Sequence, residues 1–227
     1  KQLEKLKKKQ KKSGNEGSSK VTTTKKENKK QKKYPSISVP LANNGKKVCY
    51  LTFDDGPSNN TLKIIDILDK YGIKATFFVT LTGKTSYIKK IHESGNAIGL
   101  HTASHNYSKI YSSKKAYYAD LKKVSDEVLK QTGVESKIIR FPGGSSNSIG
   151  NKYSKNIMKK LMAGVEKKGY AYFDWNIDSG DASRARPTAS YIMSNIKQSV
   201  NKQKNICILM HDTGAKSGTV EALPEMI

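Results

Sequence analysis

Hydrophobic and polar positions follow two different periods along the chain from residue 48 onward. Short apolar runs, typical of buried strands, cover residues 48–53, 75–80, 97–100, 137–141, 171–175 and 206–210. Apolar residues at helical spacing between these runs predict helices over residues 61–71, 86–93, 114–131, 152–167 and 187–200. Because strands that alternate with helices run parallel in one sheet, the pattern predicts an α/β fold with a parallel sheet or barrel.

Polar side chains gather at one end of the predicted strands. Ionisable residues stand at the carboxyl end of five strands or just beyond it: Asp54 and Asp55, the 101–105 segment, Arg140, the 174–178 segment, and His211 and Asp212. Catalytic groups converge at this edge in an α/β barrel. Packing does not explain five such positions on one edge, so we expect an active site there.

Positive charge is concentrated at the start of the chain. Of 227 residues, 42 are Lys or Arg and 19 are Asp or Glu, which gives a net charge of +23. The first 33 residues hold 14 Lys and 3 Glu, and their only large aliphatic residues are Leu3, Leu6 and Val21. Such a segment cannot bury enough apolar surface to offset the entropy of ordering. We therefore expect a disordered basic linker over residues 1–45 and one domain over residues 46–227.

The basic linker allows two interpretations. Lysine charge gives sequence-independent affinity for phosphates, as in a nucleic-acid-binding arm. The Lys run is diluted by small polar residues and has no Arg and no aromatic residue before Tyr34, so it lacks a bidentate phosphate fork and a stacking platform. We favour a solvated linker attracted to an anionic cell wall or membrane surface over one that binds nucleic acid.

The cysteines and the apolar runs bear on two further properties, disulfide formation and membrane insertion. Cys49 and Cys207 each lie in an apolar run, and we predict two buried strand thiols rather than a disulfide, because a domain of this size needs no such bond. No stretch of about 18 apolar residues exists, so the sequence predicts no membrane span.

Three strand ends carry the chemistry of a metal site. Asp54 and Asp55 are adjacent and point in different directions, so that one can bind a metal while the other faces a substrate; the alternative is a structural Asp-Gly turn. His101 and His105 are four residues apart, which lets a turn aim both imidazoles at one ion. Two His and one Asp leave coordination positions open, as a catalytic zinc requires.

Two further strand ends supply polar groups for hydrolysis. Arg140 offers a fixed cation that can hold a carboxylate ionised, and the N–H of Gly143 in the turn that follows can donate to an oxyanion. His211 ends the last predicted strand, and a carboxylate partner upstream would make it a general acid.

The five segments TFDDGP, HTASH, RFPGG, WNIDSGD and LMHD, in this order, resemble the NodB-type polysaccharide deacetylases of carbohydrate esterase family 4. The resemblance covers roughly residues 46–227. It implies a distorted (β/α) barrel and the hydrolysis of N-acetyl or O-acetyl groups of a sugar polymer. It also implies a divalent metal, zinc in the first place, with cobalt or nickel as alternatives.

The resemblance assigns a role to each candidate residue. The metal ligands would be Asp55, His101 and His105. The general base would be Asp54, oriented by Arg140, and the general acid would be His211, tuned by Asp178, with Asp174 and Asp181 as alternatives. Substrate contacts would come from Pro142, Gly143, Trp175 and Leu209, with Gly143 completing an oxyanion hole and the last two lining a pocket for the acetyl methyl group.

The sequence departs from the family pattern at two places. Where many members have an aromatic residue after the Asp block, this chain has Ala182, so we expect a less aromatic groove wall. The chain stops at Ile227, where members usually continue into one more helix and a final strand, and we expect the barrel to lack these elements.

The expected substrate is the N-acetylglucosamine of peptidoglycan, because a flexible Lys-rich spacer suits an enzyme that is tethered at a bacterial surface. Chitooligosaccharides, xylan and another exopolysaccharide are alternatives, and so, from a different class, is an inactive basic protein that binds cell wall or nucleic acid. We expect an extracellular or surface-anchored bacterial monomer. Since the chain starts at Lys1, we expect its signal or anchor upstream.

Overall fold

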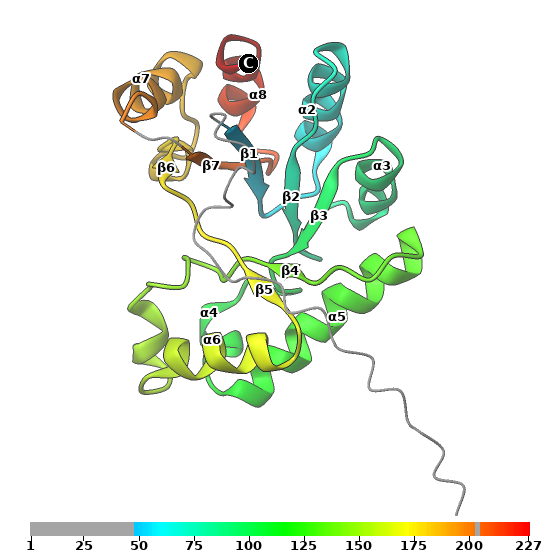
Figure 1. The fold of residues 1–227 in the computed structure, drawn as a ribbon, viewed down its shortest axis with the longest axis vertical. Coiled ribbons are helices and arrows are strands. Elements are labelled where there is room, and N and C mark those ends of the chain that lie inside the picture. The colour runs from blue at the N-terminus through cyan, green and yellow to red at the C-terminus, as the bar shows by residue number, and fades with distance from the viewer. Residues whose placement is uncertain (1–47, 203–204) are drawn as a thin grey trace, which may run out of the picture. The chain divides into compact units, whose positions relative to one another are not determined.

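The structure, a computed structural model, describes residues 48–202 and 205–227, in which one parallel sheet holds all the strands. The strand order is β5-β4-β3-β2-β1-β7-β6, so that β1 lies between β2 and β7 (Figure 1). The strands are β1 (Val48–Asp54), β2 (Thr76–Val79), β3 (Ala97–Leu100), β4 (Ile138–Ile139), β5 (Ala171–Tyr172), β6 (Ile177–Asp178) and β7 (Asn205–His211). The sheet curls into a distorted barrel that stays open between its edge strands β5 and β6, which confirms the predicted fold class.

Helices cover the outside of the curled sheet. Neighbouring helices contact one another in the order α7, α8, α2, α3, α5 and α6 around it (Figure 1). Their bounds are α2 (Asn59–Lys70), α3 (Ile88–Glu93), α5 (Lys114–Thr132), α6 (Ile157–Lys167), α7 (Ala189–Val200) and α8 (Ser217–Met226). The short helix α4 (Tyr107–Ile110) and the 3₁₀ turns η1 (Thr85–Tyr87), η2 (Ile149–Lys152) and η3 (Asp181–Ser183) complete the described elements.

Along β1 and β7, side chains that pack against the helices alternate with side chains that point into the barrel. On β1, Leu51 and Phe53 point outward to the helices, where Phe53 stacks on Phe77 of β2 with ring centroids 5.1 Å apart. Side chains of a strand point alternately to opposite faces, so Asp54 points into the barrel. Strand β7 pairs with β1 over its whole length and brings His211 opposite Asp54. A continuous core outside the sheet therefore fixes two ionisable side chains at the inner rim.

The predicted elements are present, with differences where strands are short. The strand predicted at 137–141 is reduced to β4, and the one predicted at 171–175 is reduced to β5. Strand β6, at the opposite edge of the sheet from β5, was not predicted. Helices α4 and α8 were not predicted. The run over 107–110 is only one turn, and α8 contains Pro224, which masks a helical pattern.

Two sequence-based expectations about the chain have different outcomes. The two cysteines are free, and Cys207 is buried as predicted, but the prediction of a buried thiol is wrong for Cys49, which lies exposed near the start of β1. The predicted basic linker over residues 1–45 lies outside the described residues. In the part of the chain that the structure describes, no helix combines the length and apolar character that a bilayer crossing requires.

Candidate active site

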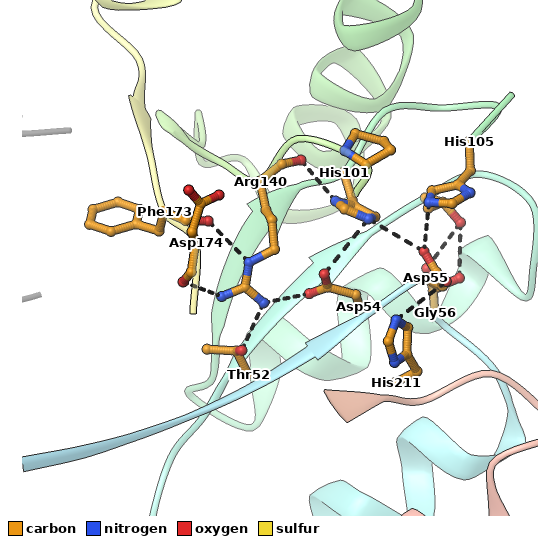
Figure 2. A network of polar contacts seen from close by, with 12 residues as sticks. Thr52, Asp54, Asp55, Gly56, His101, His105, Arg140, Phe173, Asp174 and His211 are labelled. Atoms are coloured by element: carbon orange, nitrogen blue, oxygen red, sulfur yellow. Dashed lines mark hydrogen bonds and ion pairs between the residues drawn. The ribbon is translucent and has the colours of Figure 1, made fainter. Parts of the chain in front are cut away.

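A buried ion pair at the end of β1 fixes the first carboxylate of the site. The Arg140 guanidinium donates to Asp54 Oδ1 and to Thr52 Oγ1, each at 2.8 Å. Its remaining N–H groups donate to the carbonyl oxygens of Phe173 at 3.1 Å and Asp174 at 3.0 Å (Figure 2). Both charged side chains are nearly inaccessible to water. Burial raises the pKa of Asp54 above its ordinary value, although the charge of Arg140 acts in the opposite direction.

Three side chains from two loops converge beside this pair. Asp55 Oδ1 lies 3.4 Å from His101 Nε2 and 3.3 Å from His105 Nε2 (Figure 2). Ligand atoms of a tetrahedral zinc, with bonds of about 2.0–2.2 Å, lie about 3.3–3.6 Å apart, so these distances suit one shared ion. Asp55 Oδ1 is buried and accepts no hydrogen bond within the described residues, which leaves it free to bind a cation. The residues predicted to bind the metal therefore form a candidate Asp-His-His site.

A hydrogen bond to a backbone carbonyl fixes the tautomer of His101. His101 Nδ1 lies 2.8 Å from the carbonyl oxygen of Arg140, and because a carbonyl only accepts, Nδ1 carries the proton. Burial lowers the pKa of His101 to about 3, so the ring stays neutral. The unprotonated Nε2 therefore faces Asp55 as a ligand atom.

A carboxylate on α5 shapes the histidine loop. Asp120 Oδ1 accepts the backbone N–H groups of Ala103 at 2.7 Å and Ser104 at 2.9 Å. The same loop contains two left-handed residues, Thr102 with φ 71° and His105 with φ 47°, and such conformations persist only where neighbours hold them. Asp120 thus holds the segment between the two histidines. The sequence analysis did not predict this role, although a buried Asp in the apolar stripe of a helix is a usable signal.

The partner of His211 differs from the prediction. His211 Nδ1 lies 2.7 Å from Asp181 Oδ1, and its backbone N–H donates to Asp181 Oδ2 at 2.7 Å. Asp181 is fully buried, whereas Asp178 is exposed and accepts the N–H of Gly180. The prediction that Asp178 tunes His211 is therefore wrong, and the alternative Asp181 occupies that position. The 3₁₀ turn η3 brings Asp181 back against β7 after β6 has ended.

The Asp181 contact sets the charge of His211. Burial alone would lower the pKa of His211, but the hydrogen bond and charge of Asp181, helped by Asp54 and Asp55, raise it to about 9. Burial would likewise raise the pKa of Asp181, but the hydrogen bonds and charge of His211 bring it below its usual range. His211 is therefore protonated at neutral pH. His211 Nε2 faces the candidate Asp-His-His site and lies 3.9 Å from Asp55 Oδ2.

The turn after β4 exposes a backbone N–H group near the candidate Asp-His-His site. Gly143 has φ 78°, which favours glycine, and its N–H has no acceptor within the described residues. Tyr111 Oη donates to the carbonyl oxygen of Pro142 at 2.7 Å and anchors this turn from below. The Tyr107 hydroxyl lies next to Gly143, and the Tyr107 ring meets His105 edge-on, with ring centroids 5.5 Å apart.

The predicted acetyl pocket is only partly assembled around this turn. The Trp175 ring packs on Gly144. The same ring lies over the Arg140 guanidinium, whose central carbon is 5.5 Å from the ring centroid. Leu209 is buried on β7, two positions before His211, and so faces the barrel interior. The structure therefore places Trp175 near the Arg140 end of the site and Leu209 on the same strand face as His211.

Two further carboxylates, Asp212 and Asp174, shape the loops, and Asp174, one of the alternatives for the partner of His211, contacts Ser145 instead. Asp212 accepts the Thr61 hydroxyl at 2.5 Å, and burial raises its pKa to about 7. Asp174 accepts the N–H of Ser145 at 2.9 Å and thereby fastens the turn that contains Gly143. Both residues stand at strand ends in the sequence, which was the available signal.

Comparison with known proteins agrees with this geometry. The family model for polysaccharide deacetylases matches residues 42–162. The chain is 33% identical over 192 residues to a putative polysaccharide deacetylase, YheN, of Bacillus subtilis, covering 82% of this chain and 64% of that protein. It is 30% identical over 199 residues to a peptidoglycan-N-acetylglucosamine deacetylase of Bacillus cereus, covering 84% of this chain and 68% of that protein.

A solved structure shares the fold of the described domain. The catalytic domain of peptidoglycan N-acetylglucosamine deacetylase from Eubacterium rectale superposes with a TM-score of 0.78 at 38% sequence identity. The match covers 84% of this chain and 86% of that one. The chain thus spans nearly all of a solved catalytic domain but about two thirds of the two curated relatives.

Proposed function

Because the chain belongs to the polysaccharide deacetylase family, we propose that it hydrolyses the N-acetyl groups of N-acetylglucosamine in peptidoglycan, as a metal-dependent amidase. One observation carries the proposal. A carboxylate held by an arginine and an imidazole held by a second carboxylate both lie within 4 Å of the Asp-His-His site: Asp54 Oδ2 is 3.7 Å from His101 Nε2, and His211 Nε2 is 3.9 Å from Asp55 Oδ2. In this arrangement Asp54, as the base, and His211, as the acid, both face one bound substrate.

Zinc is the metal that we propose for Asp55, His101 and His105. Two neutral imidazoles and one carboxylate are ligands that zinc prefers, and three protein ligands leave room for water and substrate. A divalent ion held there lowers the pKa of water from about 15.7 toward 7 and polarises the acetyl carbonyl. Cobalt or nickel would suit the same donor set.

The residues of the chain perform the proton transfers. Asp54, whose pKa burial raises, accepts a proton from the attacking water while the water oxygen bonds to the acetyl carbon. The Gly143 N–H donates to the carbonyl oxygen as negative charge develops on it. His211, charged through Asp181, then gives a proton to the sugar nitrogen as the carbon–nitrogen bond breaks. The products are acetate and a free amine.

Location and the basic N-terminal residues complete the proposal. The peptidoglycan substrate would lie outside a bacterial cell, and the 14 Lys of the first 33 residues would draw the enzyme to an anionic wall or membrane surface. A monomer would suffice, since each residue placed in the site belongs to one chain. Deleting residues 1–33 should weaken adsorption to purified walls and leave hydrolysis of a soluble chitooligosaccharide unchanged; equal loss on both would refute this role.

Acetate release from a substrate panel tests the function. The panel contains peptidoglycan, chitin oligomers and acetylxylan, each with the metal-stripped protein and with added zinc or cobalt. We expect release from peptidoglycan that depends on added metal. Acetate release only from acetylxylan would contradict peptidoglycan as the substrate. Equal release with and without added metal would contradict a metal-dependent reaction.

A ligand variant gives a second readout that does not depend on substrate. His101→Ala removes one imidazole from the site and should lower bound zinc, measured by elemental analysis after dialysis, together with activity. Normal activity in a His101→Ala protein that contains no divalent ion would exclude the proposed metal site.

A further inference from the structure

Arginine has an uneven distribution in this lysine-rich chain. Only three of the 42 basic residues are arginine: Arg140 in the site, and Arg184 and Arg186. The last two stand in the loop between β6 and α7, which also contains Ala182, where we expect a less aromatic groove wall. An arginine fork binds a carboxylate or phosphate through two parallel hydrogen bonds, which a lysine ammonium cannot do.

The loop is fastened directly to the catalytic acid's partner. Lys216 Nζ donates to the carbonyl oxygens of Asp181 and Arg184, each at 2.8 Å. The Arg184 backbone therefore lies beside that of Asp181, whose side chain holds His211. Catalytic groups occupy this edge of the barrel, so a polymer whose acetyl group reaches His211 must pass close to this loop.

Neither guanidinium group forms an ion pair with a carboxylate among the described residues, although Arg184 contacts Tyr191. Arg184 and Arg186 are exposed, and among residues 48–202 and 205–227 the arginine that forms an ion pair is Arg140 alone. The Arg184 guanidinium carbon lies 3.9 Å from the ring centroid of Tyr191 on α7, which restricts its motion. A cation that is held in place without a carboxylate partner loses less entropy when it binds an anion.

We infer that Arg184 and Arg186 form a subsite for an anionic group of the polysaccharide, on a sugar near the one that is deacetylated. The inference rests on the proposed function and narrows its substrate to a glycan that carries carboxylate or phosphate oxygens. Peptidoglycan strands carry carboxylates, and phosphate polymers attached to them carry phosphodiesters. A neutral chitooligosaccharide lacks both and would leave the subsite empty.

Kinetics on charged and neutral substrates test the subsite. The double variant Arg184→Gln/Arg186→Gln should raise KM for peptidoglycan strands by about tenfold, as loss of charged hydrogen bonds does, with kcat retained. KM for the neutral chitooligosaccharide should not change. Arg184→Lys, which keeps the charge but not the fork, should give an intermediate KM. The same assays on strands with amidated carboxyl groups, and on walls before and after removal of phosphate polymers, identify the group that binds.

A matched control removes the same charge elsewhere. Lys159→Gln/Lys167→Gln deletes two exposed cations from α6, on the outside of the barrel, and should leave KM for peptidoglycan strands unchanged. An equal change on charged and neutral substrates would show a structural role for the loop and overturn the subsite, and so would no change on either.

Binding separates this inference from the proposed function. Cosedimentation of wild-type and double-variant protein with peptidoglycan strands requires no catalysis. A wild type that releases no acetate from any substrate would contradict the proposed function, whereas equal binding of wild type and variant would contradict the subsite by itself.

Discussion

At the scale of single residues, two titratable groups of the site differ in protonation state because their partners differ. Asp54 is buried against Arg140, and His211 is buried against Asp181. Pairs whose surroundings give them different protonation states are how one site holds both a base and an acid at neutral pH. In the proposed reaction the carboxylate accepts the first proton and the imidazolium donates the last.

Asp54→Asn removes the base while it keeps the shape of the side chain. General base catalysis contributes about 10²–10⁴ in rate, so we expect kcat to fall by that factor while bound zinc is retained, because Asp54 is not among the proposed ligands. Acetate release and metal content are measured on the same sample. Unchanged release with full metal content would mean that Asp54 is not the base.

Asp181→Asn should move the alkaline limit of activity. The acid must be protonated, so activity is lost as pH rises through the pKa of His211, which Asp181 helps raise to about 9. Without the Asp181 charge that pKa falls, and the alkaline limb of the kcat profile should shift to lower pH. Asp178→Asn, at an exposed carboxylate that does not contact His211, should leave the limb in place. A shift in the second variant and none in the first would restore the original assignment.

This pair also shows what a sequence can and cannot determine at the residue scale. Asp54 and His101 were predictable because each directly follows a strong apolar run, and Asp55 and His105 because they come one and four residues after them. Asp174, Asp178 and Asp181 follow one another so closely that spacing cannot distinguish them. The distinction depends on the turn η3, which returns Asp181 to β7 and is not visible as a pattern.

At the scale of elements, helices supply groups that shape the strand-end loops. Asp120 reaches from α5 to two N–H groups between the metal-binding histidines. Loops that carry ligands need such support, because their left-handed residues are otherwise unfavourable. Helix α5 was predictable from its apolar stripe, and apolar runs marked the places of β4 and β5 but not their short lengths. Strand β6 was not predicted, because two residues are too few to show a period.

Asp120→Ala should therefore weaken metal binding without touching a ligand. Loss of an outer-shell partner typically costs about 10–100-fold in affinity, and we expect the zinc Kd to rise by that factor, as measured by competition with a chelating dye. Excess zinc should restore activity. Asp126→Ala on the same helix, at an exposed residue paired with Lys122, is the control. Equal zinc affinity in wild type and Asp120→Ala would exclude the role.

At the scale of the whole molecule, the barrel is joined across its open side by side-chain contacts. Arg140 extends from the end of β4 to β1 and to two carbonyl groups of the 173–176 segment, which runs between the two edge strands. The predicted barrel was correct in class, but its open side was not predictable, because the 173–176 segment is held by single hydrogen bonds, from Arg140 and from Asn176, rather than by a repeating pattern.

Arg140→Met should destabilise the fold more than Asp54→Asn. Removing one partner of a buried ion pair costs about 3–5 kcal/mol, because the other charge stays buried and unpaired. Asp54→Asn is milder, since Arg140 retains Thr52 and the two carbonyl oxygens. Urea unfolding of metal-free protein measures both changes. Equal losses would mean that Arg140 contributes to stability through Asp54 alone.

The double use of Arg140 ties activity to the integrity of the barrel. If the 173–176 segment came away from β4, Arg140 would lose the two carbonyl oxygens that help to fix it while it still contacted Asp54. We therefore expect damage at the open side of the sheet to lower the rate of hydrolysis before the whole domain unfolds.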